Sequence, residues 1–111
     1  LDTGSRYFWF PVDGVANPIE AISKRYFELP SPYGSSFADR IKYLSDMVKE
    51  FRVEGIVFLT RKFCDPYLFD YPILGQAMKE EGVPSLLLEY EYPLARAALK
   101  TRVEAFVEML R

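Results

Sequence analysis

Apolar side chains recur at helical spacing in two long stretches of the chain. Residues 37–52 carry one apolar face, and residues 94–110 carry another. The first face consists of Phe37, Ile41, Leu44, Val48 and Phe51, and the second of Leu99, Val103, Phe106, Val107 and Leu110. Ser36 is a suitable N-cap for the first stretch. The pattern predicts a helix over each.

A third helix is predicted to start at Asn17, because an N-cap, Pro18 and an acidic Glu20 follow one another as at many helix starts. Its apolar residues are expected to point inward: Ile19, Ile22, Tyr26 and Phe27. The segment 29–34 contains two prolines and a glycine, and it is therefore predicted to be a rigid loop.

Two short, continuous apolar runs read as strands buried on both faces, at residues 56–59 and 84–90. Between them, Pro72 is expected to prevent one continuous helix, so the main helix is predicted from near Pro72 to Glu81, before Gly82. Helices alternating with strands predict an α/β fold with parallel strands and right-handed crossovers.

Two strands make too small a sheet for this number of helices. The run Tyr-Phe-Trp-Phe at 7–10 is a candidate third strand. We therefore expect an incomplete domain, the C-terminal part of a larger α/β domain.

The composition argues against several classes of function. The formal charge of −2 and the scattered basic residues argue against a nucleic-acid-binding face. The sequence has no apolar run of membrane-spanning length and no signal peptide, and its single cysteine cannot form an internal disulfide, so we expect a cytoplasmic protein. The absence of histidine excludes a Ser-His-Asp triad, a Cys-His pair and His-ligated zinc within this chain.

The single cysteine, Cys64, follows the first apolar strand and precedes a helix start signalled by Asp65 and Pro66. Ligands of α/β proteins gather where strands end and helices begin. The helix dipole and the neighbouring Arg61 and Lys62 favour the thiolate, which binds metals or attacks electrophiles. A buried, inert cysteine is the alternative from the residues alone.

Five motifs, taken together and in order, resemble the carboxyl-terminal region of the 2-hydroxyacyl-CoA dehydratase and benzoyl-CoA reductase family, 2-hydroxyglutaryl-CoA dehydratase D-component type. They are Asp-Thr-Gly-Ser-Arg-Tyr-Phe at 2–8, Leu-Pro-Ser-Pro at 29–32, Lys-Phe-Cys-Asp-Pro at 62–66, Phe-Asp-Tyr-Pro at 69–72 and Thr-Arg-Val-Glu-Ala-Phe at 101–106. The resemblance extends to the related double-cubane proteins and covers essentially the whole chain.

The resemblance implies a Rossmann-like (flavodoxin-like) parallel sheet and a heterodimer with a paralogous subunit. Each such subunit holds a [4Fe–4S] cluster through three of its own cysteines, of which Cys64 matches one. Lys62 and Asp65 are candidate residues next to the cluster, although helix capping is the more economical role for Asp65. Ser31 stands where many relatives carry cysteine, and it is not predicted to be a ligand.

The same resemblance implies a lyase of anaerobic metabolism. A separate ATP-hydrolysing iron–sulfur activator supplies one electron, and water is eliminated from a 2-hydroxyacyl-CoA. The isolated 111-residue chain is expected to be inactive, because one thiolate cannot hold a four-iron cluster. The alternatives are a benzoyl-CoA reductase-type subunit, a double-cubane-type electron-transfer protein and a non-catalytic domain that forms the heterodimer.

Overall fold

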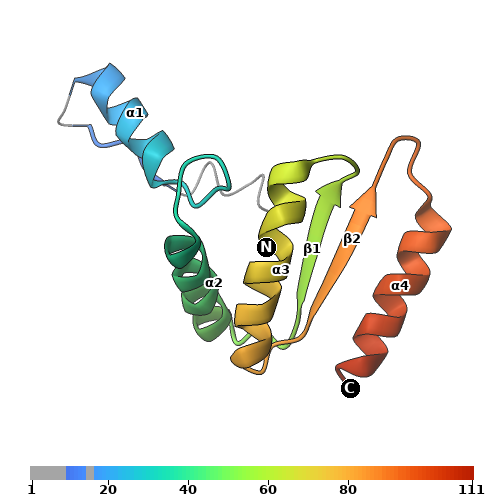
Figure 1. Ribbon diagram of the computed structural model, residues 1–111. Helices are drawn as coiled ribbons and strands as arrows, with labels where there is room; N and C mark the ends of the chain where they lie inside the picture. The colour runs from blue at the N-terminus through green and yellow to red at the C-terminus, as the bar shows by residue number, and fades with distance from the viewer. Residues whose placement is uncertain (1–9, 15–16) are drawn as a thin grey trace.

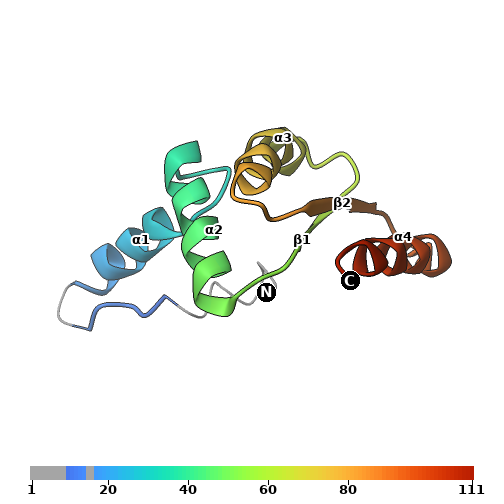
Figure 2. The same cartoon turned by 90° about the horizontal axis from the view of Figure 1, so that it is seen from below.

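The computed structural model of the chain describes residues 10–14 and 17–111. These residues form α1 (Pro18–Glu28), α2 (Phe37–Phe51), β1 (Ile56–Arg61), α3 (Asp65–Glu80), β2 (Ser85–Tyr90) and α4 (Arg96–Met109). β1 and β2 pair in parallel, with Ile56 opposite Ser85 and Arg61 opposite Tyr90. α2 lies next to α3, and α4 runs alongside β2 on the side away from α3 (Figures 1 and 2). The predicted α/β fold is confirmed, and the small sheet makes it an incomplete domain.

Two helix starts form as the sequence predicts, because a side-chain oxygen satisfies a backbone N–H in the first turn. The Asn17 Oδ1 atom accepts a hydrogen bond from Ile19 N at 3.0 Å, which begins α1. The Ser36 Oγ atom accepts one from Asp39 N at 3.2 Å, which begins α2. α2 ends as Arg52 turns into the left-handed region, with φ of 50°.

α3 differs from the prediction, since it runs without a break from Asp65 to Glu80 and contains Pro72. A proline inside a helix lacks one N–H and so removes one backbone hydrogen bond. Contacts on both sides of Pro72 compensate for that loss: the ring of Tyr71 packs edge-on against Phe58 of β1 at 5.3 Å, and Leu74 is buried. Tertiary packing therefore outweighs the local preference for a break.

The core lies where α3 packs on the sheet and on α2. Asp70, Leu74 and Met78 follow one another at four-residue steps and are all buried. The buried apolar side chains of the described residues are Ala21, Leu29, Leu74, Met78, Val83, Leu88 and Phe106. The Ser45 hydroxyl in the middle of α2 donates a hydrogen bond to Glu81, which joins α2 to the C-terminal end of α3.

α4 is attached through its C-terminal part to the beginning of β1. A Cβ atom at Gly55 would lie 2.8 Å from Leu110 Cδ1 and 3.0 Å from Phe106 Cζ, so a larger residue here would force the ends of these side chains to shift. Arg102 donates a hydrogen bond to the Leu87 carbonyl of β2 at 2.8 Å. Of the predicted apolar face of α4, Phe106 is buried, Leu99, Val103 and Leu110 are half-buried, and Val107 is exposed.

Two burial predictions are wrong. The apolar residues of α1 are exposed, by 78% for Ile19 and 76% for Phe27, because α1 stands apart from the sheet (Figure 1). Ile22 and Tyr26 are exposed as well. β1 is covered on one face only: α3 packs on the face of Phe58, whereas Leu59 on the opposite face is 61% exposed.

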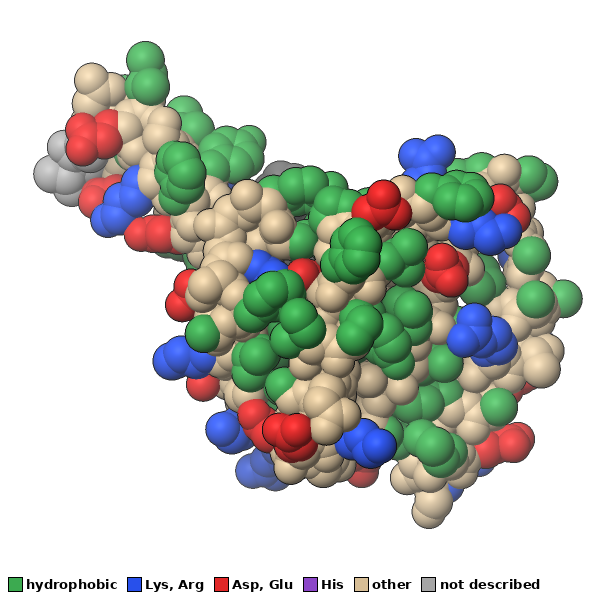
Figure 3. All heavy atoms as spheres, in the orientation of Figure 1, with side chains coloured by type: hydrophobic (Ala, Val, Ile, Leu, Met, Phe, Trp, Pro, Cys, Tyr) green, Lys and Arg blue, Asp and Glu red, His purple; other side chains and the backbone are tan. Residues whose placement is uncertain are grey.

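The candidate third strand at 7–10 lies outside the described residues except for Phe10, which is in a bend. The motif at 2–8 also lies outside them. The space-filling view shows hydrophobic side chains gathered on α1 and over α2 and α3 (Figure 3). Phe37 of α2 and Phe69 of α3 are both exposed. Of the helices in the described part, none has the length and apolar character needed to cross a membrane.

Candidate functional site

Cys64 lies in the short connection between the carboxyl end of β1 and the beginning of α3. Its N–H donates to the Arg61 carbonyl at 3.1 Å, and its own carbonyl accepts from Tyr67 N at 3.2 Å and Leu68 N at 3.1 Å. The thiol is unpaired and half-buried. The structure therefore places Cys64 at a strand end and a helix N-terminus, as the sequence predicts, and this is where α/β proteins bind ligands.

Asp65 does not cap α3, contrary to the sequence-based prediction. It is the first residue of the helix, Pro66 is the second, and Cys64 occupies the N-cap position without a side-chain capping bond. The helix starts one residue early because the Cys64 carbonyl already accepts the first helical hydrogen bond. An aspartate in the first turn still stabilises the positive end of the helix dipole.

Phe63 makes the sharp turn between strand and helix possible. Its φ is 64°, which is the left-handed region that a bulky side chain rarely adopts. Its side chain is 85% exposed, so the ring gains little from burial in the described structure. Strain of this kind is found most often beside functional sites.

Lys62 interacts with the carboxyl end of β2 through both its backbone and its side chain. Its N–H donates to the Tyr90 carbonyl at 2.8 Å, and its ammonium forms an ion pair with Glu91 at 2.8 Å. The hydrogen bond and the charge of Glu91 raise the pKa of Lys62 above 10.5, with Glu89 adding a smaller effect. Lys62 thus joins the loops that follow β1 and β2. A role for Lys62 or Asp65 beside a bound cluster stays a prediction.

We expect Glu91→Gln to bring the pKa of Lys62 back toward 10.5, because it removes the group with the largest influence on that amine. A raised lysine pKa means that the pair stabilises the fold below pH 10.5, and that this contribution is lost as the pH rises through the folded-state pKa. NMR titration of the Lys62 Cε resonance measures the shift. Glu89→Gln is the matched control and should lower the pKa less; an equal or larger drop would contradict the assignment.

A buried ion pair lies between α2 and α3. Arg40 Nη2 is 2.8 Å from Asp70 Oδ1, and the two side chains are only 7% and 8% exposed. Arg40 Nη1 donates to the backbone carbonyls of Ser31, at 3.2 Å, and Ser35. The guanidinium also stacks on the Phe37 ring, 4.6 Å from its centroid. Arg40 therefore links α2 both to α3 and to the loop between α1 and α2.

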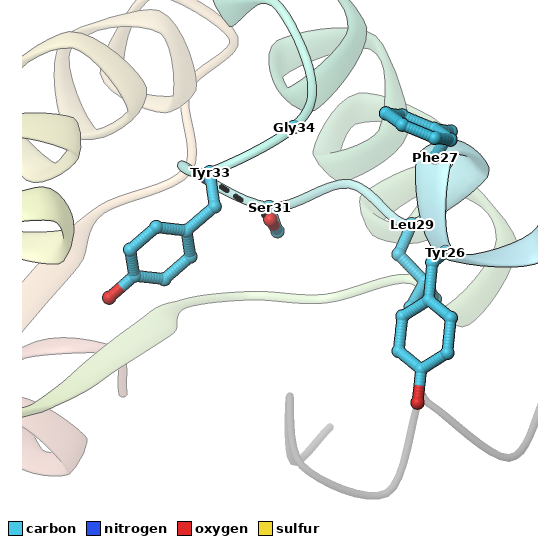
Figure 4. A pocket seen from close by; sticks show the side chains of 6 residues that line it. All are labelled: Tyr26, Phe27, Leu29, Ser31, Tyr33 and Gly34. Atoms are coloured by element: carbon cyan, nitrogen blue, oxygen red, sulfur yellow. Dashed lines mark hydrogen bonds between the residues drawn. The ribbon is translucent and has the colours of Figure 1, made fainter. Parts of the chain in front are cut away.

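That loop approaches the first turn of α3. The rings of Tyr33 and Tyr67 meet edge to face with their centroids 6.2 Å apart, and Tyr67 N is bonded to the Cys64 carbonyl. The loop also borders an open hollow of about 310 Å³, lined by Tyr26, Phe27, Leu29, Ser31, Tyr33 and Gly34. In Figure 4, Tyr26 and Tyr33 point to the same side of this hollow and Phe27 to the other. Ser31 is thus part of the loop that reaches the Cys64 turn through Tyr33.

Sequence reasoning misses the pairing of Arg40 with Asp70. In the sequence, Arg40 reads as one of several scattered charges, and Asp70 only as part of a motif. A signal is present for Asp70, which stands four residues before Leu74 and eight before Met78, on the buried stripe of α3. A charge on such a stripe predicts a buried partner, but the sequence does not show which arginine or lysine it is.

The donor chemistry of the site fits one ligand of an iron–sulfur cluster and no more. The N-terminus of a helix stabilises the negative charge of a thiolate ligand, and the half-buried Cys64 lies at the N-terminus of α3. Among residues 10–14 and 17–111, no three His, Cys, Asp or Glu side chains are close enough together to hold a metal ion. Any further ligands must come from outside the described residues.

Comparison with known proteins decides the family. The family described as 2-hydroxyglutaryl-CoA dehydratase, D-component, matches residues 1–110. The chain belongs to this family. The predicted resemblance to this family is therefore confirmed.

Family relatives include dehydratase and reductase subunits. The chain is 32% identical over 89% of its length to the lactoyl-CoA dehydratase subunit beta of Anaerotignum propionicum. It is 36% identical over 64% of its length to the (R)-phenyllactyl-CoA dehydratase beta subunit of Clostridium sporogenes. It is 27% identical over 77% to a benzoyl-CoA reductase subunit of Thauera aromatica. These matches cover 27%, 19% and 23% of the relatives, so the chain spans about a quarter of their length.

Proposed function

We propose that this chain is the C-terminal part of one subunit of a 2-hydroxyacyl-CoA dehydratase. Family membership supports the proposal, and so do two relatives whose names are those of dehydratase beta subunits. The observation that carries it is the place of Cys64, half-buried where β1 ends and α3 begins. In the proposed complete subunit, Cys64 is one ligand of a [4Fe–4S] cluster, and two upstream cysteines complete the protein's contribution.

The cluster, when bound, would supply one-electron chemistry for the removal of water from a 2-hydroxyacyl thioester. This chain's own part is to present the thiol in a fixed position. The backbone bonds of Cys64 to Arg61, Tyr67 and Leu68 fix the start of the helix and so limit where the sulfur can lie. The proposed partners are a paralogous subunit and an ATP-dependent activator, and the proposed location is the cytoplasm.

Cys64→Ser in the complete subunit is expected to lower bound iron sharply and to abolish turnover, because a serine hydroxyl does not replace a thiolate ligand. The helix content should hardly change, since the N-cap position of Cys64 makes no side-chain capping bond. Iron analysis, visible absorbance and far-UV circular dichroism of anaerobically purified protein test this. Asp65→Asn is the control and should retain iron. Unchanged iron in Cys64→Ser would refute the ligand role.

A reductase-type subunit is the second candidate, because a benzoyl-CoA reductase subunit is among the relatives. The two dehydratase subunits are more similar to the chain in sequence identity, 32% and 36% against 27%, which favours the dehydratase. Turnover of 2-hydroxyacyl-CoA against aromatic acyl-CoA separates them. A complete protein that is iron-free when made without oxygen, yet forms a stable heterodimer, would favour the non-catalytic alternative.

A further inference from the structure

We propose that the Arg40–Asp70 pair is a positioning device for the Cys64 site. In this proposal, the pair holds the loop 29–36 as a wall beside the first turn of α3. Arg40 and Asp70 would act through this loop and would not touch substrate or cluster. The biological meaning of the inference rests on the proposed function, but its test does not require a bound cluster.

The contacts form a continuous path from α2 to Cys64. Arg40 binds the Ser31 and Ser35 carbonyls on one side and Asp70 on the other. The loop between these carbonyls carries Tyr33, whose ring meets Tyr67. Tyr67 is in the first turn of α3 and donates its N–H to the Cys64 carbonyl. Each step is a hydrogen bond or a ring contact, and together they connect the loop to the turn that carries Cys64.

Stability alone does not explain the pair. A buried ion pair has a large desolvation cost, and well-packed apolar residues of similar volume often stabilise a protein equally well or better. The Arg40 Nε–H has no hydrogen-bond partner within the described part of the chain, which adds to that cost. What apolar residues do not offer is a set of donors for two loop carbonyls. The arginine fork can bind these carbonyls and a carboxylate at once.

The loop has its own hydrogen bonds, but they are local. Ser35 N donates to Ser31 O at 3.1 Å, and the Ser35 hydroxyl binds the same carbonyl at 3.0 Å. These bonds shape the turn without joining it to α3. The bonds of Arg40 do connect the loop to α3. The guanidinium binds the Ser31 and Ser35 carbonyls of the loop and also pairs with Asp70 of α3.

The test uses the metal-free complete subunit with the double substitution Arg40→Met and Asp70→Leu, which replaces both charged side chains by apolar ones. We expect cooperative unfolding at a temperature near or above that of the wild type. Exchange of the Ser35 amide hydrogen should be about tenfold faster or more, because the loop has lost its charged donor. Alkylation of Cys64 by iodoacetamide, followed by mass spectrometry of its peptide, should be several-fold faster because the wall has opened.

Two further variants separate the contact of Arg40 with the loop from the contact of Tyr33 with Tyr67. Tyr67→Leu keeps the Arg40 contacts and removes the ring contact, so it should speed alkylation of Cys64 without speeding Ser35 exchange. Arg40→Lys keeps the charge but not the fork, and it should reproduce both changes even if the double variant fails to fold. The control is Lys42→Met with Asp46→Leu, which removes the exposed pair of α2 and should change neither rate.

Unchanged alkylation of Cys64 in a folded Arg40→Lys or double variant would overturn the inference, whatever the stability. Because the measurement is made without iron, its failure is distinct from failure of the cluster proposal. Loss of iron in Cys64→Ser with unchanged alkylation in the Arg40 variants would leave the cluster assignment in place and remove the positioning role.

Discussion

Asp70→Ala should lower the free energy of unfolding by about 3–5 kcal/mol, because it leaves the Arg40 charge buried without its carboxylate. The side chain of Arg40 is 7% exposed, so water can solvate the guanidinium only if the packing of α2 against α3 opens. The two loop carbonyls remain as partners, but they are neutral and do not replace the ion. Urea denaturation of the complete subunit, followed by far-UV circular dichroism, measures the loss.

Asp46→Ala is the matched control for this substitution. Asp46 also pairs with a basic residue of α2, Lys42, but the two side chains are 58% and 75% exposed. Water replaces such a partner readily, so the denaturation midpoint should hardly move. Equal effects of the two substitutions would show that the Arg40–Asp70 pair is as well solvated as a surface pair, which would contradict its buried position.

The sequence predicts the order and type of the elements well, because the signals are local. The Asn17 and Ser36 caps, the helical spacing of residues 37–51 and the two apolar strand runs each depend on neighbours in the chain. Burial does not follow from local pattern alone. The apolar face of α1 reads as a core face, yet Ile19 is 78% exposed, since burial depends on what lies opposite.

The helix break expected at Pro72 is a second case in which contacts between distant residues, and not the local sequence pattern, decide the structure. A local rule places a helix start there, but packing of Tyr71 on Phe58 and the burial of Asp70 and Leu74 hold the helix on both sides of the proline. These contacts join residues far apart in the sequence. The partner of Asp70 is thirty positions away, and no periodicity identifies it.

The position of Cys64 is predictable, because strand, turn and helix signals follow one another within a few residues. Its surroundings are not. The pairing of Lys62 with Glu91 joins two loops separated by 29 positions, and the left-handed conformation of Phe63 has no signature in its residue type. The cluster role of Cys64 stays a prediction from the family resemblance, and the Cys64→Ser experiment tests it.

Met78→Ala should destabilise the protein by about 2–5 kcal/mol, through lost apolar burial and through the cavity that remains. Met78 is 0% exposed, the most deeply buried large side chain of the described residues. It lies on the buried stripe of α3, and its carbonyl accepts a hydrogen bond from Val83 N at 2.9 Å, where the chain turns toward β2. The neighbouring side chains have little room to fill the cavity, because α3 packs against α2 on one side and against the sheet on the other.

Met109→Ala is the control, since Met109 is 61% exposed near the end of α4 and its truncation leaves no cavity. Denaturation curves of the two variants in the complete subunit should differ clearly in midpoint. A small effect at Met78 would mean that the α2–α3–sheet contact is not the core that stabilises this region. Because Asp70, Leu74 and Met78 share one stripe, that result would also weaken the case for a rigid wall beside Cys64, whose position depends on the same helix.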